Sequence, residues 1–165
     1  MHDSSMNRIR EFVKKYIDVN EDIKVLDVGS CQVQRQKSYR ELFNSPRWKY
    51  YGMDIKAGDN VDIVAMSLYD WGIGISYDVV ISGQCLEHVK DVKEWILQVD
   101  KCLKPGGTVC IIAPWLWRRH RYPIDCWRIL PDGMEFLLKD VCGFRMLECF
   151  IKGNDCIGIA RKVMK

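Results

Sequence analysis

Residues 25–30, with the sequence VLDVGS, constrain the fold of this chain more than any other segment. They predict a buried strand that ends in an acid, a glycine and a small polar residue. A second predicted strand, residues 48–54, also ends in an acid, Asp54. In open α/β sheets, ligands bind beyond the carboxyl ends of the strands. Carboxylates at two such ends, Asp27 and Asp54, suit a ligand with an amino group at one end and a ribose diol at the other.

The hydrophobic pattern predicts strands that alternate with helices, and hence a mostly parallel sheet covered on both faces. Residues 152–155 fit a hairpin turn, which makes the closing pair of strands antiparallel. The expected fold is three-layer α/β with seven strands. The predicted strands are residues 24–28, 48–54, 61–65, 77–82, 108–113, 145–151 and 156–163. The predicted helices are residues 8–17, capped by Ser4 or Ser5, residues 38–43, residues 91–103 capped by Asp91, and one that begins at Pro131.

Three connections in this pattern need particular attention. Only a few residues separate the second and third strands, whereas parallel pairing normally needs a dozen or more. These two strands are therefore expected to be non-adjacent or to be joined by a loop. Residues 66–76 have room for a turn or two of helix. Residues 104–107, Lys-Pro-Gly-Gly, are expected to stop the preceding helix, with a glycine in the left-handed position at its C-terminus.

Length and composition indicate one soluble domain over residues 1–165, in which 48% of residues are hydrophobic. An N-terminal helix lies within residues 1–20, and residues 115–130 form a basic aromatic loop. No apolar run approaches the roughly 20 residues that a membrane span needs. The N-terminus also lacks the apolar core and cleavage site of a signal peptide. We therefore expect a cytoplasmic protein.

The eight cysteines do not predict a metal site or disulfides, because no C-x-x-C pair occurs and the gaps match no zinc pattern. Most lie in apolar segments, where a free cysteine behaves as a small hydrophobe. Cys31 and Cys85 differ, since both fall in predicted loops at strand ends.

The net charge of +3 is concentrated in one segment. Residues 115–128 hold four arginines and one aspartate, so this segment alone carries the whole excess. It also contains His120 and three tryptophans. This distribution indicates a local surface for anions on a protein that is not basic elsewhere.

Four features in order resemble a known family. They are the Asp27-x-Gly29 loop, the acid Asp54, residues 77–82 running into Leu-Glu-His-Val at 86–89, and Leu-Lys-Pro-Gly-Gly at 103–107. Together they resemble the Rossmann-like class I S-adenosylmethionine-dependent methyltransferases, specifically the small-molecule group of the UbiE type. The likeness covers nearly the whole chain.

The first loop departs from the usual glycine-rich pattern. A dinucleotide-binding fold would require G-x-G-x-x-G here, and only Gly29 is present. Relatives in the resembled family commonly have further glycines at the positions of Cys31 and Val33. A loop without them approaches a ligand less closely, which makes weakened or lost cofactor binding an alternative.

The resemblance implies a site for S-adenosylmethionine, with S-adenosylhomocysteine as the product. Asp27 and Gly29 would line the methionine end, and Asp54 would accept hydrogen bonds from both ribose hydroxyls. Ser30 and Cys31 would present backbone groups, and Ser82 and Gly83 would face the sulfonium and amino groups. Ile55 would pack on the adenine. The edge of the adenine would be flanked by Met66, Ser67 and Leu68.

The resemblance also places the basic aromatic loop, residues 115–130, on the acceptor side. Its arginines suit an anionic small-molecule or sugar-linked acceptor. His88 and His120 are the candidate general bases, although His88 packs or binds substrate in alternative interpretations. Asp125 and Arg128 are expected to be structural. The predicted acceptor contacts are Trp115, His120, Arg121 and Tyr122.

The sequence leaves two alternative functions to consider. The sparse glycine loop and short connections favour, as an alternative, a catalytically degenerate binding protein or partner subunit, and a homodimer is also compatible with the sequence. Nucleic-acid methylation is disfavoured, because four arginines in one loop are few for a duplex binder. The Asn/Asp-Pro-Pro-aromatic motif of amino methylation does not occur either.

Overall fold

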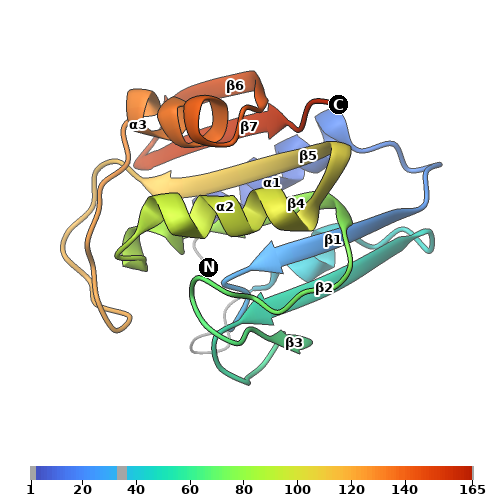
Figure 1. The fold of residues 1–165 in the computed structure, drawn as a ribbon, viewed down its shortest axis with the longest axis horizontal. Helices are drawn as coiled ribbons and strands as arrows, with labels where there is room; N and C mark the ends of the chain where they lie inside the picture. Colours follow the sequence, from blue (N-terminus) through green and yellow to red (C-terminus); the bar gives the residue numbers. More distant parts are fainter. Residues whose placement is uncertain (1–2, 33–36, 165) are drawn as a thin grey trace.

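The computed structural model describes residues 3–32 and 37–164, which form a seven-stranded sheet of order β3-β2-β1-β4-β5-β7-β6 (Figure 1). Strand β7 is antiparallel to both neighbours, and the other pairs are parallel. The predicted fold class is confirmed. The strands are β1 (Ile23–Val28), β2 (Trp48–Asp54), β3 (Ile63–Val64), β4 (Tyr77–Gly83), β5 (Leu103–Pro114), β6 (Arg145–Lys152) and β7 (Asp155–Arg161). The helices are α1 (Asp3–Tyr16), η1 (Tyr39–Leu42), η2 (Leu86–His88), α2 (Val92–Cys102), α3 (Pro131–Glu135) and η3 (Phe136–Val141).

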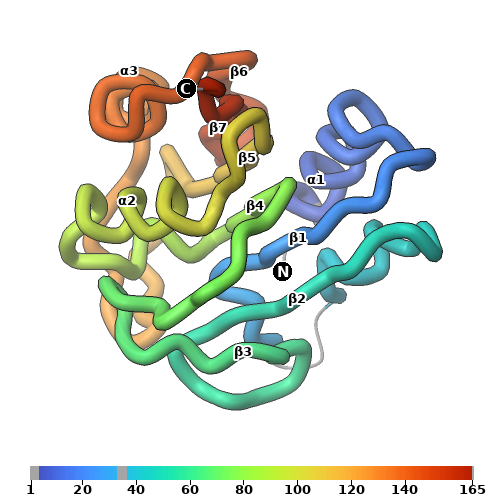
Figure 2. Tube along the Cα trace, turned by 45° about the vertical axis from the view of Figure 1, so that its right-hand side comes forward, coloured from blue at the N-terminus to red at the C-terminus, as the bar shows by residue number. Residues whose placement is uncertain are grey.

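Helices cover both faces of the sheet, as Figure 2 shows for α1 and α2 on opposite sides. Ile9 and Phe12 of α1 pack on one face with Val25 of β1. Trp95 of α2 packs on the other face with Leu26. Because successive strand residues point to opposite faces, a strand buried on both sides must be apolar throughout. This requirement explains the apolar residues at the centres of β1, Val25 and Leu26, and of β4, residues 79–81.

Several local signals act as the sequence predicts. Ser38 caps η1 in a capping box with Glu41, and Asp91 caps α2 by accepting hydrogen bonds from two backbone N–H groups. Pro131 lies in the first turn of α3. The short link between β6 and β7 forms the expected hairpin. None of the helices in residues 3–32 and 37–164 is long and apolar enough to cross a membrane.

The N-cap of α1 and the glycine predicted at the C-terminus of α2 differ from the structure, although α2 ends within one residue of its predicted end. Helix α1 already includes Ser4 and Ser5, so neither serine is its N-cap. Extending the helix buries Met6 against the sheet, which local capping signals do not reveal. Helix α2 ends at Cys102, and Leu103 after it has an extended backbone. The left-handed glycine, Gly106, lies further on, inside the irregular start of β5.

The connection between β2 and β3 is a loop, and the two strands are adjacent and parallel. The non-adjacent alternative is therefore wrong. The loop stays close to β2 because Gly52 and Asp62 exchange hydrogen bonds: the Gly52 N–H donates to Asp62 Oδ2 at 2.7 Å, and the Asp62 N–H donates to the Gly52 carbonyl at 2.8 Å. Residues 66–76 form bends and irregular backbone, and this described segment contains no helical turn, although its length leaves room for one.

The carboxyl ends of β1, β2, β4 and β5 lie at one edge of the sheet, and the loop of residues 115–130 leaves β5 at this edge (Figure 1). All eight cysteines are free. Cys102, Cys110 and Cys156 are buried, whereas Cys126 in the loop is exposed and corrects the expectation of general burial. The edge that holds the loop also holds most of the predicted site residues.

Candidate active site

Asp27 is buried near the end of β1, with only 1% of its surface exposed. Its Oδ2 accepts a hydrogen bond from the Tyr50 hydroxyl. Its Oδ1 is also buried and has no hydrogen-bond partner among the described residues. Burial raises the pKa of this carboxyl to about 7, and the charge of Asp54 adds to the shift. The site therefore contains a buried acceptor that lacks a donor.

Asp54 ends β2 and is half-buried. Its Oδ1 accepts a hydrogen bond from the Ile55 N–H at 2.7 Å, and its Oδ2 accepts one from the Cys31 N–H at 3.1 Å. A carboxylate oxygen has two lone pairs, so each oxygen retains capacity for one further donor. The Asp54 carboxylate is thereby held at the strand end in an orientation that suits a diol.

The loop after β1 folds toward β2. Gly29 has a φ of +81° and packs against Cys85, whose side chain would lie 2.8 Å from a Cβ at this position. The N–H groups of Gly29 and Ser30 both donate to the Met53 carbonyl, at 2.9 and 3.0 Å. The N–H groups at 29–31 are thus already paired within the chain, and they are not the groups that a ligand would meet. Val33 lies outside the described residues.

The remaining predicted cofactor residues differ in how much of their surface a ligand could contact. Ile55 is 40% exposed and Met66 is 77% exposed, so both have surface available. Ser67 accepts hydrogen bonds in its own turn, from the N–H groups of Tyr69 and Asp70. Leu68 is half-buried beside this turn.

At the end of β4, Ser82 and Gly83 make contacts within the chain, although both were predicted to face the cofactor. The Ser82 hydroxyl donates to the Val28 carbonyl at 2.8 Å, so its proton links two strands. A Cβ at Gly83 would lie 2.0 Å from the hydroxyl of Tyr39, which is fully buried. Two surface cavities, of about 230 and 650 Å³, do not include Asp27, Asp54 or Ser82. The candidate site is therefore defined by polar groups at strand ends.

Glu87 is the feature of this edge that the sequence did not single out. It lies in η2, its side chain is fully buried, and both carboxylate oxygens lack a hydrogen-bond partner in the part of the chain that the structure describes. Burial raises its pKa to about 8. The one signal in the sequence is its position directly before His88, in the segment that follows β4.

The loop of residues 115–130 is held together by one ion pair, as expected for Asp125 and Arg128. Two guanidinium nitrogens of Arg128 donate to the two Asp125 oxygens at 2.6 and 2.9 Å. Arg128 also donates to the carbonyls of Trp117 and Arg118, and Asp125 accepts a hydrogen bond from the His120 N–H at 2.7 Å. The Arg128 guanidinium keeps the pKa of Asp125 well below its usual range.

The same loop is docked on η2. The Glu87 carbonyl accepts a hydrogen bond from the Cys126 N–H at 2.8 Å, and the Trp127 indole N–H donates to the Val89 carbonyl at 2.7 Å. The Ile124 carbonyl lies 2.6 Å from Nδ1 of His88. Docking therefore covers Glu87 and brings the loop against His88.

Three aromatic side chains meet where the loop contacts η2. The ring centroids of His88 and His120 are 4.9 Å apart, and Tyr122 is 6.0 Å from each. Of the predicted acceptor residues, His120 and Tyr122 thus come together, and Arg121 lies exposed between them in sequence. Trp115 does not join them, because its indole N–H donates to the Gly153 carbonyl at 2.8 Å and its ring packs on the core.

The buried Asp27 predicts a measurable pH dependence of stability. Its pKa is about 7 in the native state and roughly 3.9 when unfolded, so the native state binds more protons between these values. The free energy of unfolding should fall by up to about 4 kcal/mol as the pH rises from about 4 to about 7. Asp27→Asn should remove this component. Urea unfolding at pH 5 and pH 8 checks it, and an equal fall in the variant and in wild type would contradict it.

Comparison with known proteins adds the family context. The sequence matches the family model described as "Methyltransferase domain" over residues 26–109, slightly more than half of the chain. No curated protein matches the sequence.

Solved structures share the fold at low sequence identity. An S-adenosylmethionine-dependent methyltransferase from Aquifex aeolicus aligns with a TM-score of 0.66 and 16% identity, covering 99% of this chain and 100% of that one. The 1,6-didemethyltoxoflavin-N1-methyltransferase of Burkholderia thailandensis was solved with bound 1,6-didemethyltoxoflavin and S-adenosylhomocysteine. It aligns with a TM-score of 0.74 and 14% identity, covering 98% of this chain and 79% of that one. A third similar structure is a chain from the complex of the Haloferax volcanii Trm112 methyltransferase activator and a methyltransferase. It aligns with a TM-score of 0.67 and 14% identity, covering 98% of this chain and 95% of that one.

Proposed function

Because this chain belongs to the methyltransferase-domain family, we propose that it transfers a methyl group from S-adenosylmethionine to a small-molecule or sugar-linked acceptor. The observation that carries this proposal is the pair of carboxylates at the ends of adjacent strands. Asp27 has an unpartnered buried oxygen, and Asp54 is close enough to influence the Asp27 pKa. We further propose that the chain belongs to the small-molecule group of these methyltransferases, of the UbiE type, and that it acts in the cytoplasm.

The two carboxylates suit the two ends of the cofactor. Asp27 would accept a hydrogen bond from the amino group, which would supply the missing donor for its Oδ1. Asp54 would accept the ribose hydroxyls while it remains bonded to the N–H groups of Cys31 and Ile55. Ile55 would offer an exposed apolar surface to the adenine. When bound, the cofactor supplies an activated methyl group, so the protein's main task is to align the acceptor and exclude water.

The acceptor side is assigned to the loop that contacts η2. Tyr122 and Arg121 are exposed there and offer an aromatic face and a cation to an anionic acceptor. His88 and His120 stand beside them as groups for a proton step, which is needed only if the acceptor must lose a proton. Burial lowers the pKa of His120, so its imidazole is neutral near pH 7 and able to accept a proton.

Turnover assays test the acceptor side. The protein is incubated with methyl-labelled S-adenosylmethionine and a panel of acidic sugars and amino acids, and S-adenosylhomocysteine formation is measured. His88→Ala and His120→Ala should each lower kcat by about 10²-fold or more if the imidazole moves a proton, with cofactor affinity unchanged. His2→Ala is the matched control. Unchanged turnover and an unchanged pH profile in both variants would eliminate histidine as the base.

A second function is favoured by the closed surroundings of the strand ends. The N–H groups at 29–31 are paired within the chain, and Tyr39 occupies the space against Gly83. These contacts support a catalytically degenerate binding protein or partner subunit. A neighbour of the same fold was solved in a complex with a methyltransferase activator. Direct measurement of cofactor binding separates this alternative from an active enzyme.

A further inference from the structure

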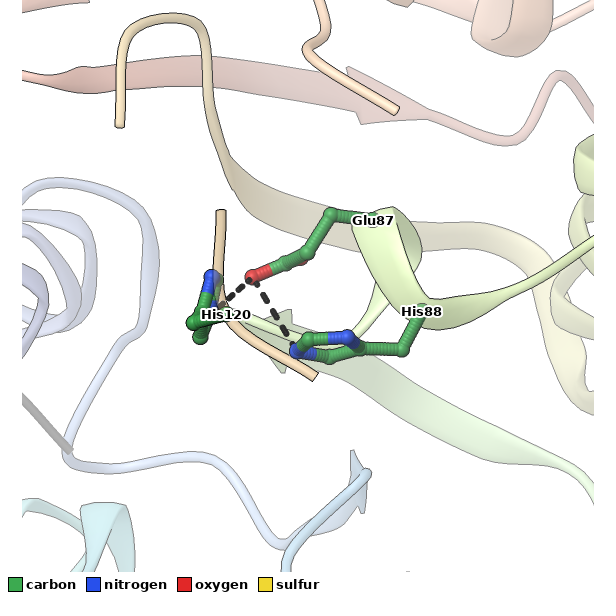
Figure 3. A group of neighbouring side chains, drawn as sticks. All are labelled: Glu87, His88 and His120. Atoms are coloured by element: carbon green, nitrogen blue, oxygen red, sulfur yellow. Dashed lines mark ion pairs between the residues drawn. The ribbon is translucent and has the colours of Figure 1, made fainter. Parts of the chain in front are cut away.

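Glu87, His88 and His120 converge on one point at the carboxyl edge of the sheet (Figure 3). Glu87 and His88 come from η2, and His120 comes from the loop after β5. Nε2 of His88 lies 3.7 Å from Oε1 of Glu87, and Nε2 of His120 lies 3.9 Å from the same oxygen. These separations are too long for hydrogen bonds, so the three groups face each other without being bonded.

The buried Glu87 carboxylate is the unexplained member of this group. Its side chain has no exposed surface, and neither oxygen has a hydrogen-bond partner within residues 3–32 and 37–164. A buried carboxyl without partners is costly, and buried charges in proteins are normally paired or coordinate a metal. The side chains that Glu87 Oε1 faces at close range are two imidazoles, and each of them offers a nitrogen lone pair.

The hydrogen bond on the His88 ring orients its lone pair toward Glu87. A carbonyl only accepts hydrogen bonds, so Nδ1 of His88, 2.6 Å from the Ile124 carbonyl, must carry the proton. Its Nε2 is then the free acceptor. Nδ1 of His120 lies 3.6 Å from Asp125 Oδ2, and Arg128 fixes Asp125 in place. Histidines that bind metals have a second partner, a carbonyl or a carboxylate, on the nitrogen that does not bind. The Ile124 carbonyl supplies this partner for His88, whereas the Asp125 carboxylate stands near Nδ1 of His120 without a hydrogen bond to it.

The distances are close to those of a coordination site. The three donor atoms lie within 4.8 Å of one another. Donors bound tetrahedrally at about 2.0–2.2 Å from zinc stand about 3.3–3.6 Å apart. Small side-chain rotations therefore suffice to close the site around an ion. Two nitrogens and one oxygen suit a transition metal, whereas Mg²⁺ and Ca²⁺ prefer oxygen ligands alone.

We propose that Glu87, His88 and His120 bind one divalent transition metal ion, with Zn²⁺ as the best match to the donor set. Three protein ligands leave a position open, as in catalytic zinc sites. The side chains of His88 and His120 are 13% and 22% exposed, so this position is reachable from solvent. It would take water or an oxygen of the acceptor. The site also ties the loop to η2. The metal site goes beyond the proposed methyl transfer and does not depend on it. An imidazole that binds the ion through its free nitrogen does not act as a general base, so metal binding and a histidine base are separate outcomes.

Calorimetric titration of the chelator-treated protein with Zn²⁺ tests the site. We expect one equivalent to bind, a rise in Tm, and no comparable effect of Mg²⁺ at the same concentration. Glu87→Gln and His120→Ala should each weaken Zn²⁺ binding at least 10-fold. His2→Ala and Cys126→Ser are the controls, and both should bind like wild type. Absence of Zn²⁺ binding, or binding that is lost in a control and retained in the ligand variants, would overturn the proposal.

X-ray absorption of the Zn²⁺-loaded wild-type protein identifies the atoms that bind the ion. This test does not depend on whether the variants fold. Nitrogen and oxygen ligands at about 2.0–2.1 Å are expected, whereas cysteine ligation would give sulfur at about 2.3 Å. A sulfur-dominated shell would contradict the assignment even if every ligand variant failed to fold. Neither measurement requires methyl transfer. A protein that does not bind Zn²⁺ can therefore be distinguished from a protein that does not transfer a methyl group.

Discussion

Asp54→Asn is expected to weaken the binding of S-adenosylhomocysteine about 100-fold. The carboxylate would accept two hydrogen bonds from the ribose hydroxyls, and bonds to charged groups contribute roughly 1.5–3 kcal/mol each. A loss of about 2.8 kcal/mol corresponds to 100-fold in Kd. Asparagine keeps one oxygen for the Cys31 or Ile55 N–H, so the strand end should stay folded. Isothermal titration calorimetry of wild type and variant measures the difference.

Asp59→Asn is the matched control for this experiment. Asp59 lies in the exposed loop after β2, and its substitution makes the same change in charge close to the site. Its effect on affinity should be less than about threefold, since charges exposed to water are strongly screened. Equal affinities of the Asp54 variant and wild type would show that Asp54 does not contact the ribose.

Gly52→Ala should lower the free energy of unfolding by about 3 kcal/mol, at the upper end of the usual cost of overpacking. A Cβ at this position would lie 1.9 Å from the Asn60 carbonyl oxygen and 2.7 Å from Ser30 Oγ. The Asn60 oxygen belongs to the backbone, so the whole loop after β2 would have to move. Gly52 is also bonded to Asp62 through both its N–H and its carbonyl, which limits how far β2 and the loop can separate.

The same substitution should disturb the loop after β1. Ser30 Oγ donates to the Asn60 carbonyl at 3.0 Å, and Asn60 Nδ2 donates to the Ser30 carbonyl at 3.0 Å. Displacing Asn60 therefore displaces Ser30, and affinity for S-adenosylhomocysteine should fall together with stability. Gly74→Ala is the control, because a Cβ there meets nothing within 4 Å. Urea unfolding checks both variants, and a Gly52 variant within about 0.5 kcal/mol of wild type would refute the packing argument.

Sequence patterns predicted the elements that burial or a local cap determines. The bounds of β2 (Trp48–Asp54) are those predicted, and Asp91 and Pro131 begin α2 and α3 as expected. The start of α1 and the entry of β5 were misplaced. Both depend on contacts between segments far apart in the chain, such as Met6 against the sheet and Gly106 bonded to Lys162. Local propensity does not contain that information.

The candidate site was predictable to a similar degree. Acids at strand ends identified Asp27 and Asp54, since parallel strands bring such ends to one edge. The burial of Glu87 was not predictable, because it results from a loop some 40 residues away that bonds to the Glu87 carbonyl through Cys126. The contacts of Trp115 were not predictable either: an aromatic residue beside arginines suggests a binding surface, and here its indole is bonded to the Gly153 carbonyl.

Calorimetric titration of the wild-type protein with S-adenosylhomocysteine tests the central claim most directly. If Asp27 and Asp54 form a cofactor site, one equivalent should bind with measurable heat and raise Tm. No heat and no thermal shift at millimolar ligand would contradict a methyltransferase and favour the degenerate partner subunit.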